Sequence, residues 1–299
     1  MKIKKRHIVF IIMIFLTIGF FSIKQSLAGF VTSKVVSELA KKKISLQVNN
    51  PDFGLLNYKA KELDFLYYYT FAPINLSLSD LTINPKISNS FFNKGFVGSV
   101  SFDAYSGSFE FDGTILNKSI QTHKLLIDKI NFSKHPQINF FGISDGLVSI
   151  DIQDALLEND NLSIDKFKIT IENFSRDFET IIPSQITKLP FSITLPEIKN
   201  GFLDLICNIK NQRLNIDFLT IKSNLLDLQI KSIVNFSNKR ILKFEQLDGD
   251  VRLSTEGLAL IGQFLPLISN NYLSVADRNF KFRLKGFNNN LPDLEFIKS

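Results

Sequence analysis

Hydrophobic and polar residues alternate along most of this chain, a pattern typical of β-strands that have one apolar and one polar face. Six stretches show the alternation with a period of two residues. Their apolar members are Val100, Phe102 and Ala104; Phe109, Phe111 and Ile115; Phe167, Ile169 and Ile171; Leu203, Leu205, Cys207 and Ile209; Leu226, Leu228 and Ile230; and Phe280, Phe282 and Leu284. One-sided patterning predicts an antiparallel sheet with one face packed and the other in water. We expect a dozen or more strands from about residue 45 to 253 and a final pair near 280–297.

Short turn signals separate these stretches. They are Tyr105-Ser106-Gly107, Asp145-Gly146, Lys199-Asn200-Gly201 and Asp248-Gly249. Glycine next to Asn, Asp or Ser between two alternating runs is typical of a tight turn. No linker rich in Gly, Pro or Ser interrupts the region, so we expect a single elongated, β-rich domain over residues 49–299.

Two segments follow helical spacing instead. From about Ser26 to Lys43, apolar residues recur every three to four positions, and Asn49-Asn50-Pro51 should end this helix and begin the sheet. A second helix is predicted after Ser254, a suitable N-cap, with Pro266 kinking or shortening it. A further short helix is expected around residues 178–188, although Pro183 opposes it.

The N-terminus predicts export. Four basic residues, Lys2, Lys4, Lys5 and Arg6, precede an uncharged apolar run from Ile8 to Ile23, which Lys24 closes. This pattern is typical of a segment that targets a membrane and keeps its basic flank in the cytoplasm. Residues 1–24 are therefore a membrane anchor or a signal peptide cleaved after Ala28, and residues 25–48 a membrane-proximal helix. The rest of the chain is therefore expected across that membrane, in a bacterial periplasm or an equivalent compartment.

Charge outside this segment is nearly balanced. The net charge of the whole chain is +6, and five of the charges are those of Lys2, Lys4, Lys5, Arg6 and Lys24, which leaves +1 from Gln25 onward. Such a body gives no reason to expect nucleic acid as a partner. The local cluster Lys41–Lys43 is either the solvated end of a helix or a contact with anionic lipid head groups.

No combination of residues predicts catalysis. The single cysteine, Cys207, lies in an alternating stretch and is expected to be a small buried hydrophobe. His123 and His135 do not have metal-ligand spacing. Asp145, Asp151 and Asp154 span a turn and a strand, which disfavours a calcium site. We therefore predict a protein that is not an enzyme, with no catalytic, cofactor-binding or metal-binding residues.

The order of features resembles a known family. A membrane segment and a short helix precede Asp52-Phe53-Gly54-Leu55-Leu56, and a hairpin runs over 102–109. Gly142-Ile143-Ser144-Asp145-Gly146 precedes a strand, and Leu189-Pro190-Phe191 precedes the stretch 198–205. The closing helix with Phe264-Leu265-Pro266 leads into the strand Phe280 to Phe287 and then Leu291-Pro292. This layout resembles type II secretion system protein N (GspN), a family similar to the AsmA-like proteins of bacterial envelopes. The family hairpin tends to carry paired glycines, whereas Ser106-Gly107 stands at that place here.

The resemblance implies a long, curved antiparallel sheet, a single-pass anchor in the bacterial inner membrane and a C-terminal body in the periplasm. It also implies two alternative functions. One is a non-catalytic, membrane-anchored periplasmic component of type II protein secretion, with other secretion-system proteins as partners. The alternative is an AsmA-like protein that binds or transfers phospholipid between the inner and outer membranes. The two differ in one structural respect: lipid binding requires that part of the apolar sheet face is not covered by other elements of the protein. A porin-like barrel is disfavoured by the N-terminal segment, the absence of tryptophan and the short predicted strands.

Overall fold

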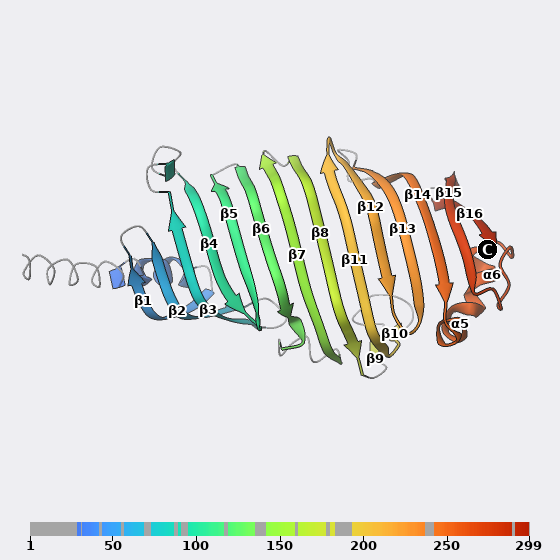
Figure 1. Ribbon diagram of the computed structural model, residues 1–299, viewed down its shortest axis with the longest axis horizontal. Coiled ribbons are helices and arrows are strands. Elements are labelled where there is room, and N and C mark those ends of the chain that lie inside the picture. Colours follow the sequence, from blue (N-terminus) through green and yellow to red (C-terminus); the bar gives the residue numbers. More distant parts are fainter. Residues whose placement is uncertain are drawn as a thin grey trace, which may run out of the picture. The chain divides into compact units, whose positions relative to one another are not determined.

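The computed structural model describes residues 29–30, 32–41, 44–54, 57–68, 73–86, 89–90, 95–116, 119–134, 142–158, 161–177, 180–182, 193–236, 242–288 and 291–298. Fourteen strands form one sheet in the order β1-β2-β3-β4-β5-β6-β7-β8-β11-β12-β13-β14-β15-β16 (Figure 1). The described pairs are antiparallel, for example β1 with β2 and β7 with β8. The prediction of a mainly β, antiparallel fold is thus confirmed. The chain divides into two compact units, Met1–Ala104 and Tyr105–Ser299.

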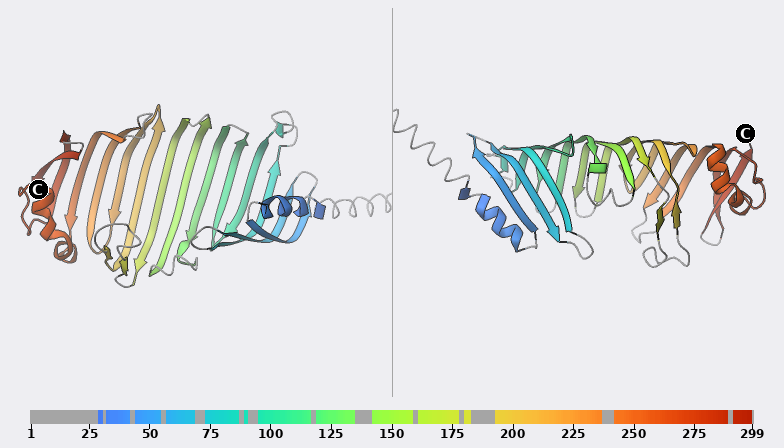
Figure 2. Two further views of the ribbon diagram at one scale, coloured as in Figure 1. Left: turned by 180° about the vertical axis from the view of Figure 1, so that it is seen from behind. Right: turned by 90° about the horizontal axis from the view of Figure 1, so that it is seen from below.

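The first unit contains four strands and a helix. The strands are β1 (Ile44–Phe53), β2 (Tyr58–Tyr68), β3 (Pro73–Pro85) and β4 (Phe96–Ala104). Ala60, Leu63 and Leu81 form its buried core. Residues 32–40 are helical, as predicted. The hydroxyls of Thr32 and Tyr58 lie 2.8 Å apart, and this contact joins the helix to strand β2 (Figure 2).

The predicted end of this helix is wrong. Strand β1 begins at Ile44 and includes Asn49, Asn50 and Pro51, which were expected to end the helix and begin the sheet. Asn50 takes a left-handed conformation with a φ of 50°, and the register with β2 resumes at Pro51 opposite Ala60. Strand β1 is terminal in the sheet order, where a proline without an N–H group is tolerated.

The second unit contains ten strands of the sheet. They are β5 (Gly107–Ile115), β6 (Ser119–Asn131), β7 (Ile143–Glu158), β8 (Asn161–Arg176), β11 (Ile198–Lys210), β12 (Arg213–Lys222), β13 (Leu226–Phe236), β14 (Leu242–Leu253), β15 (Asn279–Asn288) and β16 (Leu291–Lys298). The 3₁₀ turn η1 (Phe132–Lys134) follows β6. A separate pair, β9 (Thr180–Ile182) and β10 (Ile193–Leu195), lies between β8 and β11 in the chain. The expected number and placement of strands are confirmed.

Of the two helices predicted for the second unit, the one after Ser254 is confirmed and the one around 178–188 is not. Helix α5 (Thr255–Ile261) begins after Ser254, whose side chain accepts a hydrogen bond of 2.9 Å from the backbone N–H of Gly257. It is followed by the 3₁₀ turn η2 (Gly262–Phe264) and by α6 (Leu265–Ile268), so the helix is interrupted just before Pro266, as predicted. The helix expected around 178–188 is wrong for Thr180–Ile182, which form strand β9; its remaining residues lie outside the described part.

Three of the four predicted turns lie inside strands. Tyr105 and Ser106 form a turn, with φ values of 49° and 67° that suit a two-residue hairpin connection. Asp145-Gly146 lies within β7 and Asn200-Gly201 within β11, in both cases at a register shift. Gly249 lies in a regular part of β14. Glycine inside a strand often marks a bulge or a close approach of another group, and the sequence pattern alone did not separate these cases from turns.

The N-terminal expectations fall on residues that the structure does not describe. These are the predicted anchor (1–24), the cleavage site after Ala28, and Lys42 and Lys43. Lys41 is described and pairs with Glu38 on the next turn of the helix, at 2.6 Å. Among the described residues, no helix combines the length and apolar character needed to span a bilayer.

Candidate functional site

Apolar side chains of the second unit line up across its strands in continuous rows. Residues paired directly across antiparallel strands project from the same face of the sheet. Following the pairings from β5 to β16 gives one row through all ten strands, here named the Phe282 row. Its members are Phe109, Ile127, Ile150, Ile169, Leu205, Leu219, Ile230, Gly249, Phe282 and Phe296.

Three further rows run parallel to it on the same face. The Phe280 row comprises Ile130, Val148, Ile171, Leu203, Ile221, Leu228, Val251, Phe280 and, on the edge strand β16, Lys298. The Cys207 row comprises Phe111, Leu125, Ile152, Phe167, Cys207, Ile216, Ser232 and Leu247. The Val234 row comprises Gly113, Thr122, Ala155, Ile164, Ile209, Leu214, Val234 and Phe244. Lys298 at the sheet edge is the single charged residue of these four rows, and together the rows form what we call the apolar face.

β-Bulges keep the apolar face continuous. Strand β6 has one more residue than β5 at the register shift between Asp112 and Gly113 of β5. Strand β8 likewise has one more residue than β11 at the shift between Cys207 and Ile209 of β11. A one-residue insertion reverses which face each following side chain occupies. Ile164 would point away from Phe167 in a regular strand, but the bulge brings both to the apolar face. The strict alternation assumed from the sequence missed these shifts.

Most of the apolar face is half-buried rather than buried. The members of the Phe282 row from Phe109 to Ile230 are all intermediate in exposure. Among the described residues, α5 and α6 cover the β14–β15 end, where Leu265 and Leu273 pack with Val251, Leu253 and Phe280. An apolar surface of this extent is typical of a binding surface.

The opposite face is polar and paired. Its cross-strand ion pairs include Asp151 with Lys166 at 3.3 Å and Lys168 with Asp204 at 3.5 Å. The hydroxyl of Thr170 donates to Asp204 at 3.1 Å. Exposed pairs of this kind contribute little stability, about 0–1 kcal/mol each. Their effect is to place charge on one side of the sheet and leave the other side without it.

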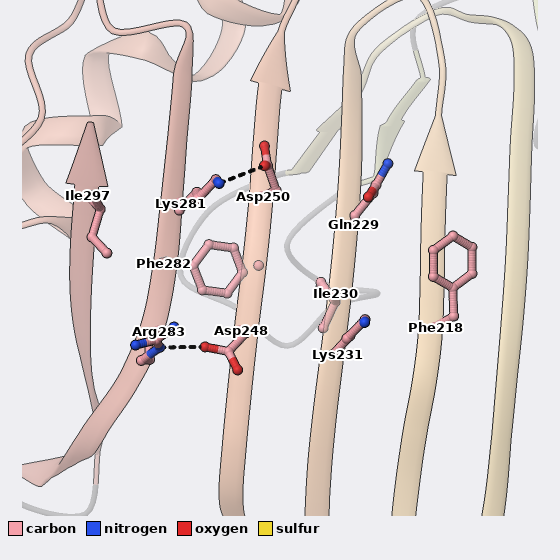
Figure 3. A pocket seen from close by; sticks show the side chains of 11 residues that line it. Phe218, Gln229, Ile230, Lys231, Asp248, Asp250, Lys281, Phe282, Arg283 and Ile297 are labelled. Carbon is pink, nitrogen blue, oxygen red and sulfur yellow. Dashed lines mark hydrogen bonds and ion pairs between the residues drawn. The ribbon is translucent and has the colours of Figure 1, made fainter. Parts of the chain in front are cut away.

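A depression of about 410 Å³ lies at β12–β16 (Figure 3). Most of its lining residues are on the polar face, among them Gln229, Lys231, Asp248 and Asp250. Arg283 donates to Asp248 at 2.7 Å, and Lys281 lies 3.8 Å from Asp250. The hydrogen bond from Arg283, with a second from Gln246, lowers the pKa of the Asp248 carboxyl. Since these carboxylates are already paired with cations, the depression is less suited to a charged ligand than the apolar face is to an apolar one.

Residues considered from the sequence for chemistry are dispersed. His123 Nδ1 lies 3.9 Å from Asp154 on the exposed surface, whereas Asp151 pairs with Lys166. Asp145 accepts hydrogen bonds from Asn131 at 3.4 Å and from the N–H of Gly146 at 2.8 Å. His135 lies outside the described part of the chain. Within the residues that the structure describes, no group of three or more His, Cys, Asp or Glu could hold a metal ion.

Cys207 is buried within the apolar face. It lies opposite Phe167 on β8 and Ile216 on β12. Burial raises the pKa of its thiol to about 11, and the Asp217 carboxylate adds to the rise. The thiol is thus protonated at neutral pH and packs as a small apolar group, as predicted.

No family model, curated protein or solved structure matches this chain.

Proposed function

We propose that this chain is a lipid-binding protein of the bacterial envelope that holds the acyl chains of phospholipids against its apolar face. The observation that carries this proposal is the half-buried Phe282 row, which crosses ten strands without a charged side chain. Of the two functions implied by the family resemblance, lipid binding is the one that needs an apolar face accessible to a ligand.

The dimensions of the face suit acyl chains. Strands in a sheet lie about 4.8 Å apart, so a row across ten strands extends for roughly 43 Å. One leaflet of a bilayer core is about 15 Å thick, which is close to the length of one acyl chain. Several acyl chains could therefore lie side by side along the rows. Burying a methylene group stabilises the bound state by about 0.8 kcal/mol, so partial burial of one chain suffices for binding.

The experiment compares neighbouring residues on opposite faces of β8. Full-length protein is purified from membranes in mild detergent, and the phospholipid that remains bound is measured by mass spectrometry. Ile169→Lys places a charge in the middle of the Phe282 row, between Ile150 and Leu205. Thr170→Lys places the same charge on the polar face, close to Asp204.

Lipid per protein should fall several-fold in Ile169→Lys and stay at the wild-type level in Thr170→Lys. Circular dichroism of both variants should keep the β-sheet spectrum, which separates lost binding from lost folding. Equal lipid content in the two variants, or no phospholipid on the wild-type protein, would contradict the proposal.

Transfer of lipid between the inner and outer membranes is the role that this binding would serve in a periplasmic protein anchored by residues 1–24. The location and the anchor are part of the proposal. Association with a type II secretion assembly rests on the sequence resemblance alone and stays a prediction.

A further inference from the structure

An uncharged segment of the second unit projects apolar side chains into solvent. Residues 257–276, between Glu256 and Asp277, contain no Asp, Glu, Lys, Arg or His, although 21% of the chain is Asp, Glu, Lys or Arg. The segment comprises most of α5, then η2, α6 and the turns that lead toward β15. A charge-free stretch of this length is common in a core, but much of this one lies on the surface.

The inner side of the segment is firmly attached to the sheet. Leu265 and Leu273 are only 0% and 1% exposed and pack in the cluster with Val251, Leu253 and Phe280. The Ser269 hydroxyl donates to the carbonyl oxygen of Leu265 at 2.6 Å and accepts from the N–H of Leu273 at 2.9 Å. These contacts fix the orientation of the segment, so its outer side is a defined surface.

The outer side consists of large apolar residues. Leu267 is 75% exposed and Ile268 58%, and they are accompanied by Phe264, Tyr272 and Val275, each at least half exposed. Single exposed apolar residues are ordinary on protein surfaces, but a cluster of five within twelve residues marks a contact surface.

The border of the cluster points to a phospholipid bilayer as its partner. Lys298 Nζ lies 5.8 Å from the centre of the Tyr272 ring and is paired with Asp277 at 3.0 Å, whereas Arg278 is exposed just beyond the segment. A charge-free apolar centre, with a tyrosine at its border and an exposed arginine beside it, suits insertion into the interfacial region of a membrane.

We propose that residues 257–276 form a membrane-docking segment that inserts Phe264, Leu267, Ile268 and Tyr272 into the surface of a phospholipid bilayer. The segment packs on Phe280, a member of the Phe280 row, and Phe282 lies two residues further along β15. A bilayer seated here would adjoin the apolar face. That last connection rests on the proposed lipid binding, whereas membrane docking does not.

The test measures the depth of single positions in full-length protein reconstituted into vesicles of phosphatidylethanolamine and phosphatidylglycerol. An environment-sensitive fluorophore is attached to Leu267→Cys, or to Lys222→Cys at the exposed end of β12 as the reference position. Cys207 is buried with a raised pKa and should not react under mild labelling conditions. Quenching is compared between vesicles with and without brominated acyl chains.

The fluorophore at position 267 should be quenched by brominated lipid and the one at position 222 should not. Phe264→Ser with Ile268→Ser should reduce the inserted fraction by about tenfold or more, because two apolar side chains leave the bilayer. Ile297→Ser is the matched control, since Ile297 is 42% exposed but lies on the polar face, opposite Lys281; it should leave quenching unchanged.

Equal quenching at positions 267 and 222 would overturn the proposal. So would a dimer, detected by sedimentation, that Phe264→Ser with Ile268→Ser dissociates, because the cluster would then bind a second copy of the chain. Ile169→Lys, which should empty the apolar face, should leave quenching at position 267 intact. The two proposals can therefore fail independently.

Discussion

Gly249 interrupts the side chains of the Phe282 row, and the ring of Phe282 occupies the space that its missing side chain leaves. A Cβ atom at position 249 would lie 2.1 Å from Cζ of Phe282. The glycine therefore lets an aromatic ring lie flat along the apolar face, which explains why a residue that resembles a turn signal stands within β14.

We predict that Gly249→Ala destabilises the protein, because the new methyl group forces the Phe282 ring out of its place. Overpacking of this kind costs about 1–3 kcal/mol. Thermal unfolding followed by circular dichroism should show a lower midpoint. Gly286→Ala on β15 is the control, since nothing lies within 4 Å of the added Cβ there, and its midpoint should not fall. Equal midpoints for the two variants would contradict the close packing of Phe282.

The buried thiol of Cys207 predicts a dependence of stability on high pH. The unfolded thiol ionises near its ordinary pKa of 9.0, whereas the folded one ionises near about 11. Between these values the unfolded state binds fewer protons than the folded state, so stability falls as pH rises. Chemical denaturation of wild type and Cys207→Ala at several pH values isolates this contribution. The stability of wild type relative to the variant should be constant below pH 9 and decrease from about 9 to about 11; a constant difference throughout would refute burial of the thiol.

At the scale of elements, Ser254 determines where α5 begins. Its side chain accepts from the N–H of Gly257, one of the amides that a helix leaves without an intrahelical partner. We predict that Ser254→Ala lowers the free energy of unfolding by about 1 kcal/mol, and that Ser254→Asp retains most of it. Urea denaturation measures both. If Ser254→Asp were as unstable as Ser254→Ala, the cap would not be the cause.

Element types were largely predictable from the sequence, but the details of the sheet were not. The alternation at Phe167, Ile169 and Ile171 is a local property, and the structure places all three on the apolar face. A bulge depends on how a strand meets its neighbour, so the sequence near Ile164 gave no sign that parity changes there. Asn200 shows the same limit, because its left-handed φ of 50° suits a turn as well as a bulge.

The candidate site was predictable only in composition. Of the Phe282 row, the alternation identified Phe109, Ile169, Leu205, Ile230 and Phe282. Their alignment into one row requires the register of ten strands, which is set by the bulges and by the packing of the whole sheet. The exposure of Leu267 and Ile268 was equally hidden, since helical spacing predicts a helix but not which of its residues face solvent.

At the scale of the whole molecule, the proposed function requires the sheet to stand outside the cytoplasm. We predict that a reporter active only in the periplasm gives signal when fused after Ser299, and that deletion of residues 1–24 abolishes it. The physical reason is that a basic tip followed by an apolar run, as in Lys2 to Ile23, is typical of segments that direct translocation. Signal from a reporter active only in the cytoplasm would instead reverse the predicted topology.

The most direct test of the apolar face is photo-crosslinking of lipid in living cells. Benzoylphenylalanine is introduced one position at a time at Phe109 and Ile150 in the Phe282 row, and at their neighbours Glu110 and Asp151 on the polar face. After illumination, full-length protein is purified and its mass is compared with that of the unilluminated sample. If the apolar face binds phospholipid, we expect adducts at Phe109 and Ile150 and none at Glu110 and Asp151. Adducts of equal yield on both faces, or none at either position of the row, would contradict it.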